Sequence, residues 1–164
     1  MKKILIFLSV AYVFFIITML IIKSVIFDVN CGGRLERAAN ANTISMAINE
    51  LDAAIAYIEE NNLTEGYTSI FYKSPSEDLS FWYQNIKSCR DELVDIPDDA
   101  SILVTSNALL KLRESLLSNG EHGESLIIPN GISKYPDNLL WFCLSLFAFI
   151  LVTFGSAILV YIYD

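Results

Sequence analysis

Two long stretches without a charged side chain limit what this chain can fold into. Residues 4–22 and 139–163 are almost wholly apolar and contain no Asp, Glu, Lys or Arg. Each reaches the roughly 20 residues that a helix needs to cross the hydrocarbon core of a bilayer. The sequence therefore predicts an all-α membrane protein with two transmembrane helices, one near each end of the 164-residue chain.

The segment between these stretches has the opposite character. Residues 28–138 hold all but one of the 19 acidic residues and all but three of the 11 basic residues, so this part is polar and strongly negative. We predict an N-terminal transmembrane helix with a short exit segment in residues 1–27, an external domain in residues 28–138, and a C-terminal transmembrane helix in residues 139–164. The negative charge argues against nucleic acid as a partner, because phosphate binding needs clustered Lys and Arg.

A cleaved signal peptide is the alternative to the first transmembrane helix, because lysines before an apolar run also begin such peptides. The apolar stretch is longer than a usual signal-peptide core and no small-residue cleavage site follows it, so we expect an uncleaved anchor. Lys2 and Lys3 favour a cytoplasmic N-terminus, whereas Lys23, Arg34 and Arg37 weaken that preference. Long loops cross membranes largely regardless of charge. We therefore expect both termini in the cytoplasm and the domain in the periplasm, with the protein in a bacterial inner membrane.

The first helix of the external domain is indicated by apolar residues at alternating spacings of three and four, which place them on one face. We expect this helix to run from about Arg34 to Asn61. The paired glycines Gly32 and Gly33 come directly before it. Because glycine is costly inside a helix, we predict a break there between the membrane helix and the domain.

Two further helices complete a predicted bundle of about three. The second is expected to begin at residues 74–77, where Ser-Pro-Ser-Glu offers a capping serine, a proline and a glutamate in the favoured order, and to end at Pro97. The third is expected to occupy about residues 98–118. Either connector, in residues 63–73 or 121–137, could hold a short strand.

The inventory of reactive side chains predicts no catalysis. His122 is the only histidine, and we interpret it as part of a solvated turn with Glu121 and Glu124, not as a metal ligand. No phosphate-binding or hydrolase motif occurs, and no base other than His122 could activate a nucleophile. We expect no metal, no cofactor and no enzymatic activity. The apolar stretches also lack the ionisable residue that a proton-coupled transporter normally carries.

Cys31 and Cys89 would share an oxidising compartment under this topology, which favours a disulfide between them. The expected helix lengths argue against it, because the two cysteines would lie at different heights along neighbouring helices. A free thiol on the apolar face of the second helix is the alternative for Cys89. Both interpretations stay open from the sequence.

Aromatic residues gather between residues 67 and 83, around a turn and a helix start. Trp82 falls on an apolar face and Phe81 is next to it, so core packing is the first interpretation. Contact with a partner or ligand is the second, because aromatic side chains dominate interface hot spots. The residues expected to form such a contact site are Tyr67, Phe71, Tyr72 and Tyr83.

The second apolar stretch contains a narrow face of mostly small residues. It consists of Ser145, Ala148, Val152 and Gly155, with Ser156 beside it. Small residues let helices approach closely in lipid, so this face predicts self-association. The alternative is that the face receives the first membrane helix, which has small residues of its own at Ser9 and Ala11.

The layout of two membrane spans around an external domain of this size resembles that of potassium-channel auxiliary β subunits. The helical apolar faces resemble the external bundle of bacterial chemoreceptors. The resemblance is one of layout, without a shared motif, so no residue role carries over.

We expect a non-enzymatic interaction or regulatory subunit that forms a homo-oligomer, touches membrane lipid and is open to contact with another membrane protein. One alternative is a homo-oligomeric channel, whose pore would be lined by Ser145, Thr153 and Ser156. The other is a ligand-binding sensor that needs a partner chain to relay its state.

Overall fold

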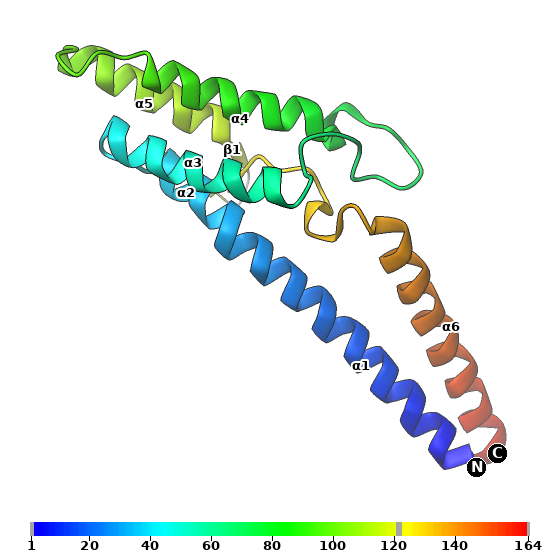
Figure 1. Cartoon of the computed structure of the whole chain (residues 1–164). Coiled ribbons are helices and arrows are strands. Elements are labelled where there is room, and N and C mark those ends of the chain that lie inside the picture. Colours follow the sequence, from blue (N-terminus) through cyan, green and yellow to red (C-terminus); the bar gives the residue numbers. More distant parts are fainter. Residues whose placement is uncertain (1, 121–122, 164) are drawn as a thin grey trace.

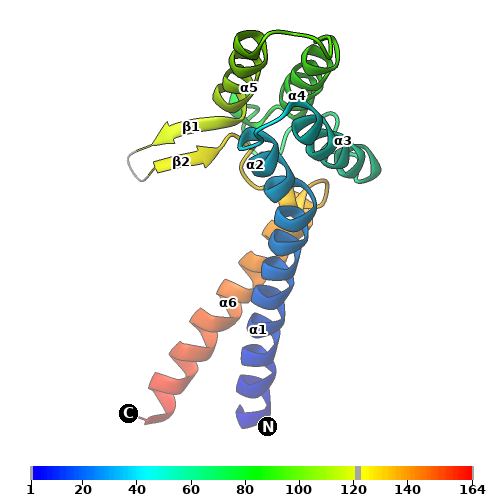
Figure 2. The ribbon, with the colours of Figure 1, turned by 90° about the vertical axis from the view of Figure 1, so that its left-hand side faces the viewer.

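The computed structural model describes residues 2–120 and 123–163, and most of them are helical. Two long apolar helices, α1 (Lys2–Phe27) and α6 (Asn138–Tyr163), run beside each other from one end of the molecule (Figure 1). The other helices gather at the opposite end, where Figure 2 shows them seated across the α1–α6 pair. By length and composition, both long helices could span a membrane, as the sequence predicts.

The elements between the long helices are short and closely packed. The helices are α2 (Gly33–Ala39), α3 (Ile44–Glu60), α4 (Leu79–Val94) and α5 (Ile102–Leu116), with the strands β1 (Leu117–Gly120) and β2 (Gly123–Leu126). The strands form an antiparallel hairpin in which Leu117 pairs with Leu126. A strand in the last connector is thus confirmed, whereas residues 63–73 make only an isolated bridge between Tyr67 and Asp78.

The predicted break at Gly32 and Gly33 is wrong. α1 continues into α2 through η1 (Asp28–Gly32), a single π-helical turn, and the Gly33 N–H donates to the Asp28 carbonyl five residues earlier. A π turn holds one residue more than an α turn and brings different backbone groups together. A Cβ at Gly33 would lie 3.0 Å from that carbonyl oxygen. Glycine therefore accommodates the turn and does not end the helix.

The chain reverses at residues 40–43 instead, so the helix expected from about Arg34 to Asn61 is two helices. α2 ends at Ala39, and Thr43 caps the start of α3 by accepting a hydrogen bond from the Met46 N–H at 3.2 Å. A threonine before an apolar run supplies the partner that the first helical N–H groups lack. This cap, which the sequence analysis missed, sets the position of the reversal.

An ion-pair cluster links α3 to α2. The Glu50 carboxylate accepts from Arg34 at 2.9 Å and from Arg37 at 2.6 Å, and the Glu50 side chain is only 12 % exposed. Charge-assisted pairs that share one partly buried carboxylate have more defined geometry than isolated surface pairs. The cluster therefore fixes the angle between the two helices at the reversal.

One face of the continuous helix from α1 to α2 lies at the centre of the core. Phe27, Cys31, Leu35 and Ala38 on this face are all 4 % exposed or less. The other helices cover it with buried side chains: Ala47, Leu51, Ala54 and Ile58 from α3, Leu79, Trp82, Ile86 and Leu93 from α4, and Leu112 and Leu116 from α5. The apolar faces predicted for three helices thus meet in one core, and α2 is a further member of the bundle.

Helices α4 and α5 both begin later than predicted. Residues 75–77 form a short 3-10 turn, and Ser74 before it makes no side-chain capping hydrogen bond. α4 is capped by Asp78, whose Oδ1 accepts from two backbone N–H groups at 2.9 and 3.2 Å. Ser101 caps α5 by accepting from the Val104 N–H, so the helix does not start at Asp98 or Asp99. In both cases a second capping residue stands closer to the apolar run and defines the start.

The π turn predicts different effects for alanine at its two glycines. Gly33→Ala should lower the thermal unfolding temperature of the detergent-solubilised protein, because the new Cβ meets a backbone carbonyl at 3.0 Å. In the matched control Gly32→Ala, the new Cβ would lie 2.8 Å from an oxygen of the flexible Asp28 carboxylate, which can move aside, and in ordinary van der Waals contact with Leu126. That change should be neutral or stabilise by up to about 1 kcal/mol, the difference in helix propensity. The reverse order of the two unfolding temperatures would contradict this account of Gly33.

Candidate functional site

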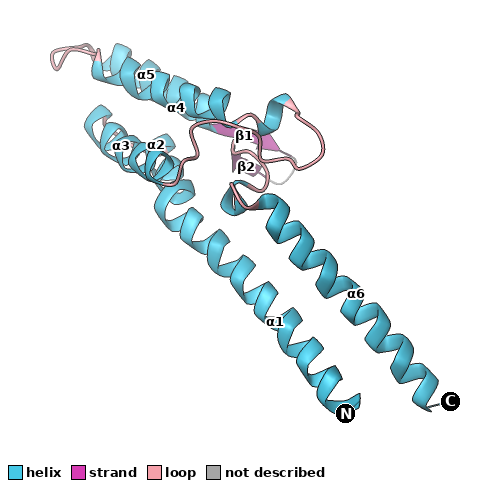
Figure 3. Cartoon of the chain, turned by 45° about the vertical axis from the view of Figure 1, so that its right-hand side comes forward, coloured by secondary structure: helices cyan, strands magenta, loops and turns pink. Residues whose placement is uncertain are grey.

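The two long helices contact each other along part of their length. The Tyr12 hydroxyl on α1 donates to the Leu144 carbonyl on α6 at 3.2 Å, and its ring meets Phe147 edge-on at 5.6 Å between centroids. Ala148 is 8 % exposed and Ile16 4 % exposed. Figure 3 shows the pair side by side. Ala148 therefore serves contact within the chain, the use that the sequence offered as the alternative to self-association.

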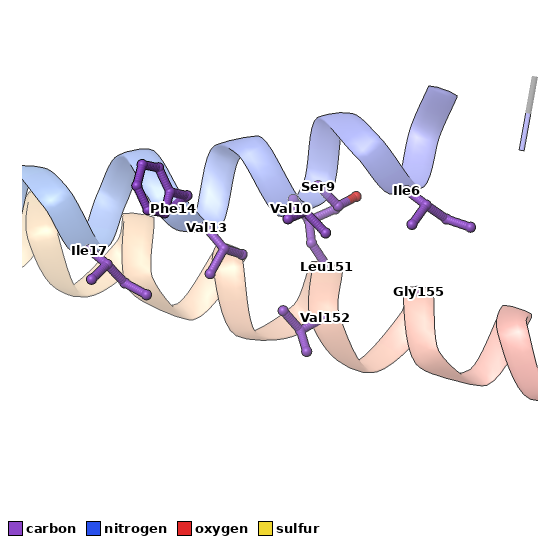
Figure 4. Close-up of a pocket in the computed structure, with 9 residues that line it drawn as sticks. All are labelled: Ile6, Ser9, Val10, Val13, Phe14, Ile17, Leu151, Val152 and Gly155. Atoms are coloured by element: carbon purple, nitrogen blue, oxygen red, sulfur yellow. The ribbon is translucent and has the colours of Figure 1, made fainter. Parts of the chain in front are cut away.

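Beside this contact the helices leave an apolar groove of about 410 Å³. Figure 4 shows the side chains that line it: Ile6, Ser9, Val10, Val13, Phe14 and Ile17 from α1, and Leu151, Val152 and Gly155 from α6. Val152 and Gly155 belong to the predicted face of small residues, Ser145 is half-buried, and the side chain of Ser156 lies outside those that the structure describes. Of the α1 residues of the groove, only Ser9 was named in the sequence analysis, because that helix was searched only for small side chains.

A polar cluster lies where both long helices enter the domain. Lys23 Nζ on α1 is 3.8 Å from the Asp137 carboxylate just before α6 and 5.3 Å from the centre of the Trp141 ring. Lysine and tryptophan are typical of the level at which a membrane helix passes through the lipid headgroups. The cluster therefore lies at the same level along both long helices, where they would leave the hydrocarbon core of a bilayer. Lys23 was considered in the sequence analysis only for orientation.

The structure separates the four aromatic residues of the predicted contact site. Phe71 and Tyr72 are 70 % and 81 % exposed, in the loop between α3 and α4. Tyr67 is half-buried, with Lys73 Nζ 5.5 Å from its ring centre. Tyr83 is 7 % exposed and does not share their surface, because it packs against α3, where its hydroxyl donates to the exposed Glu59 side chain at 2.5 Å. This hydrogen bond raises the pKa of Tyr83.

Cys31 and Cys89 are free thiols, so the disulfide between them is not formed in this structure. Cys31 is fully buried in η1, which packs on α3, whereas Cys89 is half-buried at a small cavity between α4 and α5. The two side chains thus face different neighbours. Burial raises the pKa of Cys31 to about 12 and also raises the pKa of Cys89. Cys143 is exposed on α6.

Within the described residues, no group of three or more His, Cys, Asp or Glu side chains is arranged to hold a metal ion. His122, which was interpreted as part of a solvated turn, lies outside the described residues. Comparison of the chain with protein-family models, with curated proteins and with solved structures finds no match. Two apolar surfaces are the candidate functional surfaces: the groove between α1 and α6, and the loop that exposes Phe71 and Tyr72.

The burial of the thiols predicts their order of alkylation. At pH 8, a thiol with a pKa of about 12 is thiolate in roughly one molecule in ten thousand, so Cys31 should react far more slowly with iodoacetamide than Cys89. Raising the pH should speed the reaction of Cys31, because its pKa lies above the working range. Peptide mass spectrometry measures both rates. Unfolding without reductant should expose three modifiable thiols. A count of one would instead show that Cys31 and Cys89 are joined in a disulfide.

Proposed function

We propose that this chain is a two-span integral membrane protein whose residues 28–138 form an external domain, and that it acts as a non-enzymatic interaction or regulatory subunit. The groove between α1 and α6 carries the proposal, because it offers a binding surface for a helix within the bilayer. The function includes self-association through this groove. Lipid surrounds the remaining surface of the two helices.

The exposure of the two long helices supports membrane insertion. In the most apolar window of each helix, only 11 % of the residues are buried within the protein. A core helix of a soluble protein would have most of this surface covered by its own chain. Exposed apolar side chains on this scale need lipid or another apolar surface around them. The Lys23–Asp137–Trp141 cluster supports a membrane boundary at the entry to the domain.

A second copy of the chain is the occupant that we propose for the groove. The groove is walled by Val10 and Phe14 and has Gly155 at its side, and an added Cβ at Gly155 would meet no atom within 4 Å. The same two helices also carry protruding rings that could enter such a groove: Phe7, Phe15, Phe149 and Phe154 are each more than half exposed. In lipid, this kind of close packing is what drives helix association.

For orientation, we propose cytoplasmic termini and a periplasmic domain in a bacterial inner membrane. The support is the pair Lys2 and Lys3 before the first apolar stretch, together with the acidic character of the domain. The alternative functions gain no support from the described residues. Thr153, proposed to line a pore, donates to the Ile150 carbonyl of its own helix at 2.9 Å, and Ser145 is half-buried.

Reporter fusions test the orientation. Alkaline phosphatase fused after Gly120 should be active, because it folds only after export, and a cytoplasmic fluorescent protein at that position should be dark. Fusions after Asp164 should give the opposite pattern and serve as the matched control. Fluorescence with inactive phosphatase after Gly120 would place the domain in the cytoplasm and refute the orientation.

Native mass spectrometry in mild detergent tests self-association. The parent chain should be an oligomer, and Gly155→Leu should shift it to monomer, since a large side chain at this position occupies the groove, and its Cβ meets no atom within 4 Å. The control is Cys143→Leu, which places the same side chain at an exposed position of α6 outside the groove. A monomeric parent would end the proposal of self-association. An oligomer insensitive to Gly155→Leu would move the interface elsewhere.

A further inference from the structure

The loop between α3 and α4 is tied to the start of α6. Asn138, the first residue of α6, donates a hydrogen bond to the Thr68 carbonyl, and the Tyr135 hydroxyl donates to the Glu65 carbonyl at 2.9 Å. The loop is closed at its base by the hydrogen bond from the Thr68 N–H to the Glu77 carbonyl at 3.1 Å. Figure 1 shows the loop beside the start of α6. Its height relative to the membrane helix is therefore fixed by these bonds.

The exposed part of this loop is apolar and carries one cation. Ile70, Phe71 and Tyr72 are 36 %, 70 % and 81 % exposed, and Lys73 is exposed next to them. The Tyr72 N–H donates to the Ser69 hydroxyl oxygen at 3.0 Å, which folds the loop into a turn that presents these side chains outward. Leaving such apolar side chains in water is unfavourable. The turn thus displays apolar surface that the bundle does not use.

The contact between Phe71 and Phe142 places this surface relative to the bilayer. The two rings meet edge-on with centroids 5.3 Å apart. Phe142 lies in the first turns of α6, inside the charge-free stretch 139–163, and is itself 40 % exposed. Phe71 therefore lies level with the beginning of the membrane stretch, on a side of α6 that the chain leaves open.

From this geometry we infer that residues 70–73 dip into the outer interface of the bilayer and bind phospholipid as a second membrane anchor of the domain. The inference rests on the proposed insertion of α6. Phe71 and Ile70 reach the acyl-chain boundary, the Tyr72 ring occupies the headgroup level, and the Lys73 ammonium pairs with lipid phosphate. This order of side chains matches the preferences of aromatic and basic residues at membrane interfaces.

Lipid is favoured over a protein partner because the exposed face of the loop continues directly into the exposed face of α6. Phe71 and Phe142 form one apolar surface, and the part that belongs to α6 faces lipid if the helix spans. The anchor has a mechanical consequence. Together with the two spans, it gives the domain three points of attachment and fixes how its helices lie over the membrane.

Tryptophan fluorescence in phospholipid vesicles tests the anchor with the full chain. Trp82→Phe and Trp141→Phe together remove the native tryptophans, and Phe71→Trp is then the only emitter. Its emission should be largely lost in vesicles of phosphatidylcholine brominated on the acyl chain near the headgroup. Loss should be smaller when the bromines lie deep in the chain. Two reference variants in the same background are Phe149→Trp, on the exposed middle part of α6, and Ile102→Trp, at the start of α5 and 86 % exposed.

The references separate the failure of the anchor from the failure of the span. Quenching of both Phe71→Trp and Phe149→Trp, without quenching of Ile102→Trp, supports the anchor. Quenching of Phe149→Trp alone overturns the anchor and leaves the span intact, and absence of quenching in all three overturns both. A Phe71→Trp emission that neither brominated lipid nor aqueous acrylamide quenches overturns the lipid assignment in favour of a protein cover.

A second background guards against misfolding. Trp82 is a core residue whose indole N–H donates to the Ile127 carbonyl at 3.0 Å, so its replacement can disturb the bundle. Phe71→Trp, Phe149→Trp and Ile102→Trp are therefore also made in the chain that keeps both native tryptophans. The emission of the parent chain is subtracted from that of each variant, which gives the quenching of the added tryptophan. The two backgrounds should give the same order of quenching, and an unquenched Phe71→Trp signal by difference overturns the anchor.

Discussion

The uninterrupted helix that runs from α1 into α2 is the constraint on which the rest of this structure depends. Its apolar N-terminal part pairs with α6, and its C-terminal part provides Phe27, Cys31, Leu35 and Ala38 to the centre of the bundle. The domain is thus not connected to α1 by a flexible linker, because the C-terminal part of the long helix is itself part of the domain core. Displacement of α1 relative to α6 would therefore move buried side chains of the domain directly.

Much of the secondary structure follows from local patterns in the sequence. The two charge-free stretches give α1 and α6, and the alternating spacings of three and four give the buried faces of α3 and α4, including Leu51, Ile58 and Ile86. Helix ends were harder to predict, because several residues compete to cap the same run. Ser74 and Asp78 both fit the pattern before α4, and only the packing of Leu79 into the core selects the second.

The paired glycines show where local preference misleads. Glycine is usually costly within a helix, but at Gly33 the absence of a Cβ allows a close approach to the Asp28 carbonyl. The candidate surfaces were likewise only partly predictable. The sequence placed Phe71 and Tyr83 in one group by proximity, whereas burial divides them, since Tyr83 points toward Glu59 on α3 and Phe71 toward α6. Such divisions depend on contacts distant in sequence, which periodicity does not report.

The π turn also sets how the faces of α1 are rotated about the helix axis relative to the faces of α2. Each residue of an α-helix advances the chain by about 100° around the axis, and a π turn inserts one residue beyond the α-helical count. The face of α1 that borders the groove is therefore offset in azimuth from the face of α2 that enters the core, by an amount that this extra residue sets. Residues 28–32 do not line the groove. They nevertheless determine toward which side of the domain the groove opens, because they set the rotation of α1 relative to α2.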